Sequence, residues 1–199
     1  MTFLKDTNSG KLLKEIRANS PLIWNISNFV SMDIAANMLL SIGASPAMAH
    51  AIEEAESFAN LSKAINGALT INIGTFDKHW QKCAVKVANE AKLHDIPWVL
   101  DPVGAGASEF RSNNAKELLF LKPTVLRGNG SEIISISGIS NSGKGVDSTS
   151  SSNEALDAAI KISNDNDIIV AITGEVDYVT NGSKAVSYTH LTLPTIRTV

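Results

Sequence analysis

The chain has 199 residues with a formal net charge of −3 at pH 7, and 44% of its residues are hydrophobic. This length and composition suit a single compact α/β domain with a sizeable core. Charges of both signs are scattered along the chain, so nothing points to a nucleic-acid or membrane-surface partner, and the apolar runs are too short to span a membrane. A polar N-terminus without a signal-peptide pattern, together with the single cysteine Cys83, predicts a cytoplasmic protein without an internal disulfide.

The first half of the chain alternates short apolar runs with helical patterns. Residues 22–25 are predicted to form the first buried strand, and Asn28 is expected to cap a helix over residues 29–42 that Gly43 ends in the left-handed conformation. Because this helix is apolar nearly all round, we expect it to be buried on more than one side. The other elements predicted here are strands over residues 45–49 and 68–73, a helix that begins at Glu53 and Glu54, and an amphipathic helix over residues 77–94.

The second half continues the alternation. Strands are predicted over residues 98–100, 124–126 and 167–172, and helices over residues 113–120, from Ser131 onward and over residues 151–164. Strands over residues 176–180 and 184–187 flank Asn181-Gly182, which is typical of a type I′ hairpin turn. The serine-rich stretch 135–152 is expected to form a flexible loop.

This order of elements predicts an α/β fold with a largely parallel sheet, helices on both faces and one antiparallel hairpin near the end. In such sheets ligands bind beyond the carboxyl ends of the strands. Polar residues and glycines follow the predicted strands at Asn28, Gly74, residues 101–106, residues 127–129 and residues 173–175. We therefore expect the functional site at that edge.

Asp101 follows a strand and precedes a run of small residues, Val103-Gly-Ala-Gly106. A carboxylate in this position can hold a divalent cation, while small residues let backbone amides approach phosphate groups. The alternative is an aspartate that only caps a turn. Position alone does not separate the two.

Arg127 and Glu132 form a second cluster just past a strand. Arginine can pair with phosphate, and Glu132 could share a magnesium ion with Asp101. The alternative for these two residues is an exposed arginine and a first-turn glutamate that favours the helix dipole. Thr173-Gly174 closes another strand and could touch a nucleotide, although such turns are common.

Other motifs are less informative. Residues 138–144 match all but the last position of a Walker A loop, but Gly145 replaces the metal-binding hydroxyl and the segment follows a predicted helix, so we reject it. The four histidines have no metal-ligand spacing, and Cys83 is expected to be a core residue rather than a nucleophile. Composition and spacing thus indicate a phosphate-handling α/β domain and nothing more specific.

Several motifs occur in a fixed order. They are Asn28-Phe-Val to Ala35-Ala-Asn37, Gly43-Ala-Ser-Pro-Ala-Met-Ala-His-Ala51, Asn72-Ile-Gly-Thr75, Asp101-Pro-Val-Gly-Ala-Gly-Ala107, Lys122-Pro-Thr, Arg127-Gly-Asn129 with Glu132, Lys144-Gly-Val-Asp147 and Thr173-Gly-Glu-Val-Asp177. Together they resemble the hydroxyethylthiazole kinase family of the ribokinase-like superfamily, from about Ser20 to Val186. The resemblance implies a ribokinase-like three-layer αβα fold.

It also implies transfer of the ATP γ-phosphate to the hydroxyl of 4-methyl-5-(2-hydroxyethyl)thiazole in thiamine salvage, by a homotrimer with active sites between subunits. Carried onto matching positions, Met48 would contact the thiazole, with Asn28 and Val30 nearby. Arg127 and Thr173 would bind ATP, and Asp101 with Glu132 would hold Mg²⁺. A polarizable methionine suits a sulfur-containing ring, and phosphoryl transfer depends on positioning and charge neutralisation.

The chain departs from the family at its end. Members continue to a Gly-Thr-Gly-Cys or Gly-Ala-Gly-Cys segment, whose amides bind the transferring phosphate and whose cysteine is the catalytic group, and the 199 residues contain no such segment. Residues 1–186 are therefore interpreted as the N-terminal part of one kinase domain and residues 187–199 as a non-family tail. A cloning or assembly artefact is favoured for this tail over a genuine frameshifted or rearranged terminus. We expect a fragment that is inactive, folds poorly and carries no catalytic residue.

Two alternatives remain at this stage. The chain could be a non-catalytic module that binds the thiazole or a nucleotide. It could also act on another substrate of the same superfamily, as hydroxymethylpyrimidine kinase or an ATP-dependent repair dehydratase does, because Asp101-Pro-Val-Gly-Ala-Gly106 occurs widely among relatives. The segment around Met48 favours the thiazole kinase.

Overall fold

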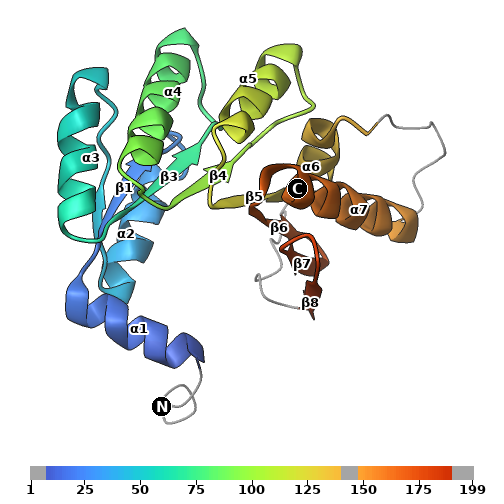
Figure 1. The fold of residues 1–199 in the computed structure, drawn as a ribbon, viewed down its shortest axis with the longest axis horizontal. Coiled ribbons are helices and arrows are strands. Elements are labelled where there is room, and N and C mark those ends of the chain that lie inside the picture. The colour runs from blue at the N-terminus through green and yellow to red at the C-terminus, as the bar shows by residue number, and fades with distance from the viewer. Residues whose placement is uncertain (1–7, 140–147, 190–199) are drawn as a thin grey trace. The chain divides into compact units, whose positions relative to one another are not determined.

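The computed structural model describes residues 8–139 and 148–189. The chain divides into two compact units, Met1–Trp98 and Val99–Val199 (Figure 1). Each unit is built from strands and helices that alternate along the chain, so the α/β prediction is confirmed.

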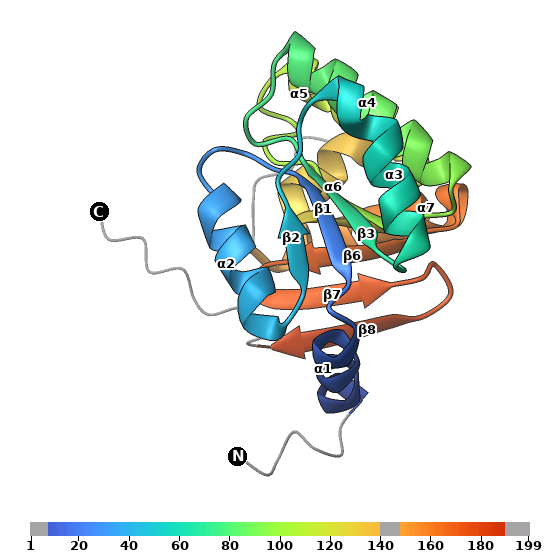
Figure 2. The same ribbon diagram turned by 90° about the vertical axis from the view of Figure 1, so that its left-hand side faces the viewer.

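Unit 1 contains a parallel three-stranded arrangement in the order β2-β1-β3. Its elements are α1 (Asn8–Asn19), β1 (Leu22–Ile26), α2 (Met32–Ile42), β2 (Ser45–Ala47), the 3-10 helix η1 (Ile52–Glu54), α3 (Ala55–Ala64), β3 (Ala68–Asn72) and α4 (Lys78–Leu93). The chain moves outward from β1 to β2 and then back past β1 to β3. Right-handed crossovers in opposite directions place α2 and α3 on opposite faces, as Figure 2 shows.

Unit 2 combines parallel and antiparallel pairs. Its elements are β4 (Trp98–Asp101), α5 (Glu109–Phe120), β5 (Val125–Asn129), α6 (Gly130–Ser137), α7 (Ser148–Asn166), β6 (Ile169–Thr173), β7 (Val176–Thr180) and β8 (Ala185–Thr189). Strands β4, β5 and β6 are parallel neighbours. In contrast, β6, β7 and β8 pair antiparallel, as Figure 2 shows. The predicted hairpin is therefore present, and the last residues of β8, 187–189, come from the segment interpreted above as a non-family tail.

The hairpin turn differs from the prediction. Thr180 pairs with Ala185, so four residues separate the paired positions rather than two. The Asn181 side chain accepts hydrogen bonds from the backbone N–H groups of Ser183 and Lys184, and only Gly182 has a positive φ. A type I′ turn needs positive φ at both central residues, so the predicted turn type was wrong.

Several helices also differ from the prediction, and among them α5 begins at Glu109 rather than at residue 113. The N-terminal helix α1 was not predicted, because its pattern is polar and Gly10 is its one buried residue. Helix α2 begins at Met32 rather than Phe29, and the Asn28 side chain caps the preceding turn by accepting from the N–H groups of Val30 and Ser31. Gly43 ends α2 with φ 96°, as expected.

The burial of α2 corrects a further prediction. None of its residues is buried within the described part of the chain, and large side chains on it and on the turn before it are exposed. The exposed fractions are 70% for Phe29, 87% for Val30, 70% for Ile34 and 63% for Met38. An apolar composition shows that a helix needs a cover, but it does not show that the same chain supplies that cover.

The core of unit 1 contains Trp24, which is fully buried and stacks on Phe58 with ring centroids 5.6 Å apart. Cys83 is also buried, and burial together with the charge of Glu53 raises the pKa of its thiol to about 11. The thiol is therefore protonated at neutral pH, which agrees with the expected core role.

Two predicted loops can be compared only in part. The serine-rich stretch is helical at both ends, since Ser135 belongs to α6 and α7 begins at Ser148. Gly138 ends α6 in the left-handed conformation, so the Walker-like segment does begin after a helix, and its residues 140–144 lie outside the described residues. No helix among the described residues is long and apolar enough to cross a membrane.

Candidate functional site

Three loops of unit 1 meet at the carboxyl ends of its parallel strands. They follow β1, β2 and β3 and begin at Ser27, Met48 and Ile73. Because the strands run parallel in the order β2-β1-β3, the loop after β1 lies between the other two. This is the edge at which the sequence predicts a ligand.

Asn28 is the central residue of this loop cluster. It is 8% exposed, and its Nδ2 donates to Asn72 Oδ1 over 2.7 Å while its Oδ1 accepts from the backbone of the next turn. Asn72 Oδ1 also accepts from the Gly74 N–H at 2.9 Å. A Cβ at Gly74 would lie 2.7 Å from Asn28 Nδ2, so a glycine is needed for this close approach.

The other two predicted thiazole contacts lie in the same cluster of loops. Val30 belongs to the turn after Asn28 and is 87% exposed. Met48 is half-buried and directly follows β2. Hydrogen bonds hold the loop around Met48, because Trp24 Nε1 donates to the Ala49 carbonyl oxygen at 2.9 Å and the Ser27 N–H donates to His50 Nε2 at 3.1 Å.

In unit 2 the strand register brings Asp101 and Arg127 together. Leu100 pairs with Leu126 in the parallel β4–β5 pair, so the next residue of each strand lies side by side. Arg127 Nη1 donates to Asp101 Oδ2 at 3.3 Å, and the two side chains are 47% and 21% exposed. An arginine and a carboxylate that are paired but still open to solvent can separate when ligands bind. The arginine can then pair with a phosphate and the carboxylate with a metal ion.

Glu132 connects two parts of this edge. It is 9% exposed, and its Oε1 accepts from the Gly104 N–H while its Oε2 accepts from the Asn129 N–H, both at 2.9 Å. Asn129 returns the contact by accepting from the Glu132 N–H, which completes a capping box at the start of α6. Glu132 thereby fixes the glycine loop after Asp101 to the first turn of α6.

Thr173 ends β6 beside the same edge. It is paired with Asn129 in the parallel β5–β6 register, and its Oγ1 donates to the Gly128 carbonyl oxygen at 3.4 Å. The turn that follows is held by buried Asp177, whose Oδ1 accepts from the Gly174 N–H at 2.9 Å. Arg127 therefore lies within β5, two residues before its end and not after the strand as predicted, and Thr173 is the last residue of the neighbouring strand β6.

The residues predicted to hold a metal provide two carboxylates. Among the described residues no group of three or more His, Cys, Asp or Glu side chains could hold a metal ion. Mg²⁺ in nucleotide sites usually takes one or two carboxylates and completes its shell with phosphate oxygens and water. Asp101 and Glu132 fit this pattern, because a carboxylate oxygen that accepts one hydrogen bond keeps a second lone pair.

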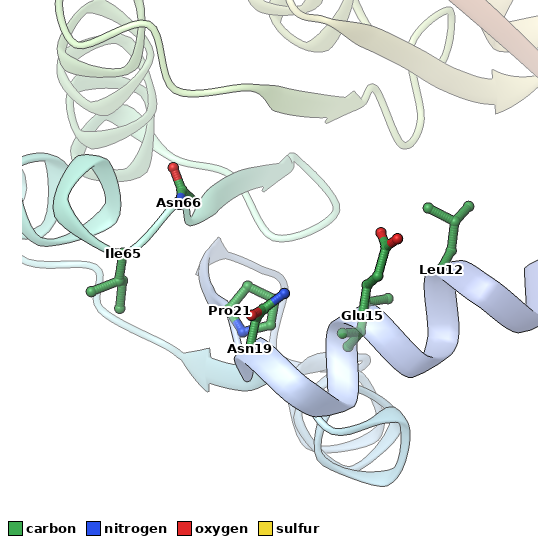
Figure 3. Close-up of a pocket in the computed structure, with 7 residues that line it drawn as sticks. Leu12, Glu15, Asn19, Pro21, Ile65 and Asn66 are labelled. Atoms are coloured by element: carbon green, nitrogen blue, oxygen red, sulfur yellow. The ribbon is translucent and has the colours of Figure 1, made fainter.

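A cavity of about 460 Å³ lies elsewhere in unit 1 (Figure 3). It is lined by Leu12, Glu15, Ile16, Asn19, Pro21, Ile65 and Asn66. Pro21 immediately precedes β1, and Asn66 lies shortly before β3. The cavity is therefore at the amino ends of these parallel strands, opposite to the loops that carry Asn28 and Met48.

Two residues that form hydrogen bonds within this loop cluster were not predicted from the sequence to have a role in the site. Asn72 and His50 fall within quoted motifs, but only their side-chain bonds to Asn28 and to the Ser27 N–H show what they do. The available signal was their position at the ends of strands, because His50 directly follows the strand predicted over residues 45–49 and Asn72 is the last residue of β3. That signal marks a location and gives no partner.

Comparison with known proteins points to one family. Residues 13–192 match the model of the hydroxyethylthiazole kinase family. The hydroxyethylthiazole kinase of Rhizobium rhizogenes is 49% identical over 179 residues, which cover 90% of this chain and 65% of that protein. That of Leptospira interrogans is 49% identical over 178 residues, or 88% of this chain and 64% of the relative. The chain thus spans slightly less than two thirds of these relatives.

Solved structures agree. The hydroxyethylthiazole kinase protein from Pyrococcus horikoshii superposes with a TM-score of 0.78 at 38% identity, over 94% of this chain and 66% of that one. A pyridoxal kinase from Staphylococcus aureus in complex with pyridoxal gives a TM-score of 0.61 at 16% identity, over 85% of this chain and 71% of that one. The second likeness shows the shared fold alone.

Proposed function

The chain belongs to the hydroxyethylthiazole kinase family, and on this basis we propose that the protein transfers the γ-phosphate of ATP to the hydroxyl of 4-methyl-5-(2-hydroxyethyl)thiazole in thiamine salvage. The observation that carries the proposal is the gathering of Asp101, Arg127 and Thr173 at the ends of neighbouring parallel strands in a chain of this family. The proposal includes a cytoplasmic location.

Each predicted residue has a distinct task in this proposal. Arg127 leaves Asp101 and pairs with a phosphate of ATP, and Thr173 contacts the nucleotide. Asp101 and Glu132 hold Mg²⁺, which neutralises charge on the phosphates when it is bound. Because Glu132 also binds the Gly104 N–H, it keeps the backbone amides of the glycine loop where phosphate oxygens can reach them.

On the alcohol side, Met48, Asn28 and Val30 bind the thiazole. The methionine thioether packs against the ring, and the buried hydrogen bond from Asn28 to Asn72 keeps the turn that carries Val30 in place. The 87% exposure of Val30 leaves room for a ligand or a second subunit on that side of the turn.

We expect Met48→Ala to weaken binding of the thiazole alcohol about tenfold to a hundredfold, because the ring loses a packed apolar partner worth about 1.5–3 kcal/mol. Binding of Mg-ATP should stay unchanged, since Met48 is not among the residues proposed to bind the nucleotide. Calorimetric titration of the unmodified chain and of Met48→Ala with the thiazole alcohol, hydroxymethylpyrimidine and pyridoxal measures the effect. Tighter binding of either other alcohol by the unmodified chain would contradict the proposed substrate.

The proposal includes a homotrimer, supported by the exposed apolar surface of α2 and the turn before it. Ile34 and Met38, 70% and 63% exposed, are one helical turn apart and lie on the same face. A charged pair, Ile34→Glu with Met38→Lys, should convert the assembly to monomers without lowering the free energy of unfolding of the single chain. Analytical ultracentrifugation tests this, with the exposed pair Leu93→Glu and Phe120→Lys, which lies outside α2, as the control. A trimer that survives the α2 changes would exclude this face.

A polypeptide made of these 199 residues alone is proposed to be inactive, because the sequence contains no Gly-Thr-Gly-Cys segment to bind the transferring phosphate. Such a polypeptide should form no thiazole phosphate at any ATP concentration. The binding experiments above distinguish an inactive chain that retains both ligand sites from one that retains neither.

A further inference from the structure

His50 occupies an unusual position in unit 1, between the ends of two parallel strands. It lies three residues beyond β2, in the loop that begins with Met48. Its ring faces Trp80 of α4 with centroids 4.5 Å apart, and Trp80 in turn meets Phe29 edge-on at 5.4 Å. The ring is therefore held by packing as well as by hydrogen bonds, and a change of rotamer would disturb both.

Both ring nitrogens have backbone partners. Nδ1 lies 3.1 Å from the Met48 carbonyl oxygen, and Nε2 lies 3.1 Å from the Ser27 backbone nitrogen. The Ser27 N–H can only donate and the Met48 carbonyl oxygen can only accept. These partners fix a neutral ring with its proton on Nδ1, because any proton on Nε2 would face the Ser27 N–H.

This pair of bonds links the two sides of the proposed thiazole site. Met48 is two residues before His50, and Asn28 directly follows Ser27. Ser27 is 5% exposed, so its N–H has little access to water as an alternative partner. Loss of the ring acceptor would leave a buried donor unsatisfied and would separate the Met48 loop from the turn at Asn28.

We propose that His50 is a positioning residue that fixes the Met48 loop against Asn28 by accepting from the Ser27 N–H and donating to the Met48 carbonyl oxygen. This inference rests on the proposed function for its effect on the thiazole, whereas the hydrogen-bonded link itself does not depend on the ligand. His50 affects substrate binding only through the position of Met48, and it takes no part in the transfer of phosphate.

The link has a definite pH dependence. Burial lowers the pKa of His50 from its ordinary value near 6.5, and the hydrogen bond to the Met48 carbonyl oxygen opposes this only in part. Near the His50 backbone, Cys83 of α4 donates from Sγ to the His50 carbonyl oxygen, and the charge of Glu53 of η1 acts on Cys83. Because the folded chain favours the neutral ring, the link is intact at neutral pH and above, and is lost as the pH falls through the lowered pKa.

The first test uses the unmodified chain without ligand. Nitrogen-15 correlation spectra of the histidine rings should give the Nδ1-protonated neutral form for His50 at pH 7, and the Ser27 amide should be protected from hydrogen exchange. A proton on Nε2 of His50, or an unprotected Ser27 amide, would overturn the proposal without reference to any substrate.

The second test uses variants. His50→Phe keeps a ring beside Trp80 and removes both hydrogen bonds, so Ser27 protection and thiazole affinity should each fall about tenfold or more. His50→Gln can offer an oxygen to the Ser27 N–H and should restore most of both, with an affinity that no longer falls as the pH is lowered through the range in which His50 titrates. The exposed His79 provides the control His79→Phe, which should change neither.

The outcomes separate the two proposals. If the unmodified chain binds no thiazole alcohol while Ser27 protection depends on His50, the link stands and the proposed substrate fails. If the chain binds the alcohol and His50→Phe binds it equally well, the positioning role fails and the proposed substrate stands. Full loss of affinity in His50→Gln, with the Ser27 amide still protected, would also contradict the positioning role.

Discussion

Trp24→Ala is expected to lower the free energy of unfolding by about 3–5 kcal/mol, the usual cost of removing a large aromatic side chain from a core. Trp24 is fully buried in β1, stacks on Phe58 and donates from Nε1 to the Ala49 carbonyl oxygen. The substitution leaves a cavity and an unpaired carbonyl at the same time. Urea denaturation monitored by circular dichroism measures the loss.

Trp24→Phe separates these two contributions. It retains an aromatic ring beside Phe58 but removes the bond to Ala49, so it should cost much less, about 1–2 kcal/mol. Because Ala49 lies between Met48 and His50, this variant should also loosen the loop that carries Met48. A Trp24→Ala chain within about 1 kcal/mol of the unmodified chain would show that β1 is not the centre of the unit 1 core.

The second large effect concerns Glu132. Glu132→Ala should lower the free energy of unfolding of unit 2 by about 3 kcal/mol, because two backbone N–H groups, of Gly104 and Asn129, lose a charged acceptor. The loss should appear as faster hydrogen exchange at those two amides. Glu154→Ala on α7 is the control, since Glu154 is an exposed carboxylate and its removal should change neither measurement.

Glu132→Gln distinguishes the structural task of this residue from its proposed metal task. Gln retains one oxygen that can accept from a backbone N–H, so most of the stability should remain. Without the negative charge, the Mg²⁺ dependence of ATP binding should weaken. Unchanged Mg²⁺ dependence in Glu132→Gln would leave Glu132 as a clamp for the glycine loop and remove it from the metal site.

The strands and the residues that follow them could be predicted from the sequence, because the signals are local. The short apolar run before Asp101 marks the end of β4, whereas β5 continues past Arg127 to Asn129. The parallel register then places the side chains of Asp101 and Arg127 next to each other. The αL glycine at Gly43 was equally predictable, since its conformation depends on the helix it ends.

The remaining errors arise from non-local contacts. The apolar pattern of α2 indicates that its surface needs a cover, but it does not identify a second molecule as that cover. The pairing of Thr180 with Ala185 leaves four residues in the turn that contains Asn181-Gly182. The local preference of Asn-Gly for a two-residue turn therefore does not determine the loop length. The bond between His50 and Ser27 joins residues 23 positions apart and depends on the order of the strands.

The central claim, that this chain is the thiazole-binding and nucleotide-binding part of a hydroxyethylthiazole kinase, is tested most directly with a chimera. Residues 1–186 are joined to the segment that follows the matching position in the Rhizobium rhizogenes relative, and the folded product is assayed with Mg-ATP and three alcohols side by side. We predict phosphate transfer to the thiazole alcohol in preference to hydroxymethylpyrimidine and pyridoxal. A folded chimera that binds Mg-ATP but phosphorylates one of the other two alcohols faster would contradict the account.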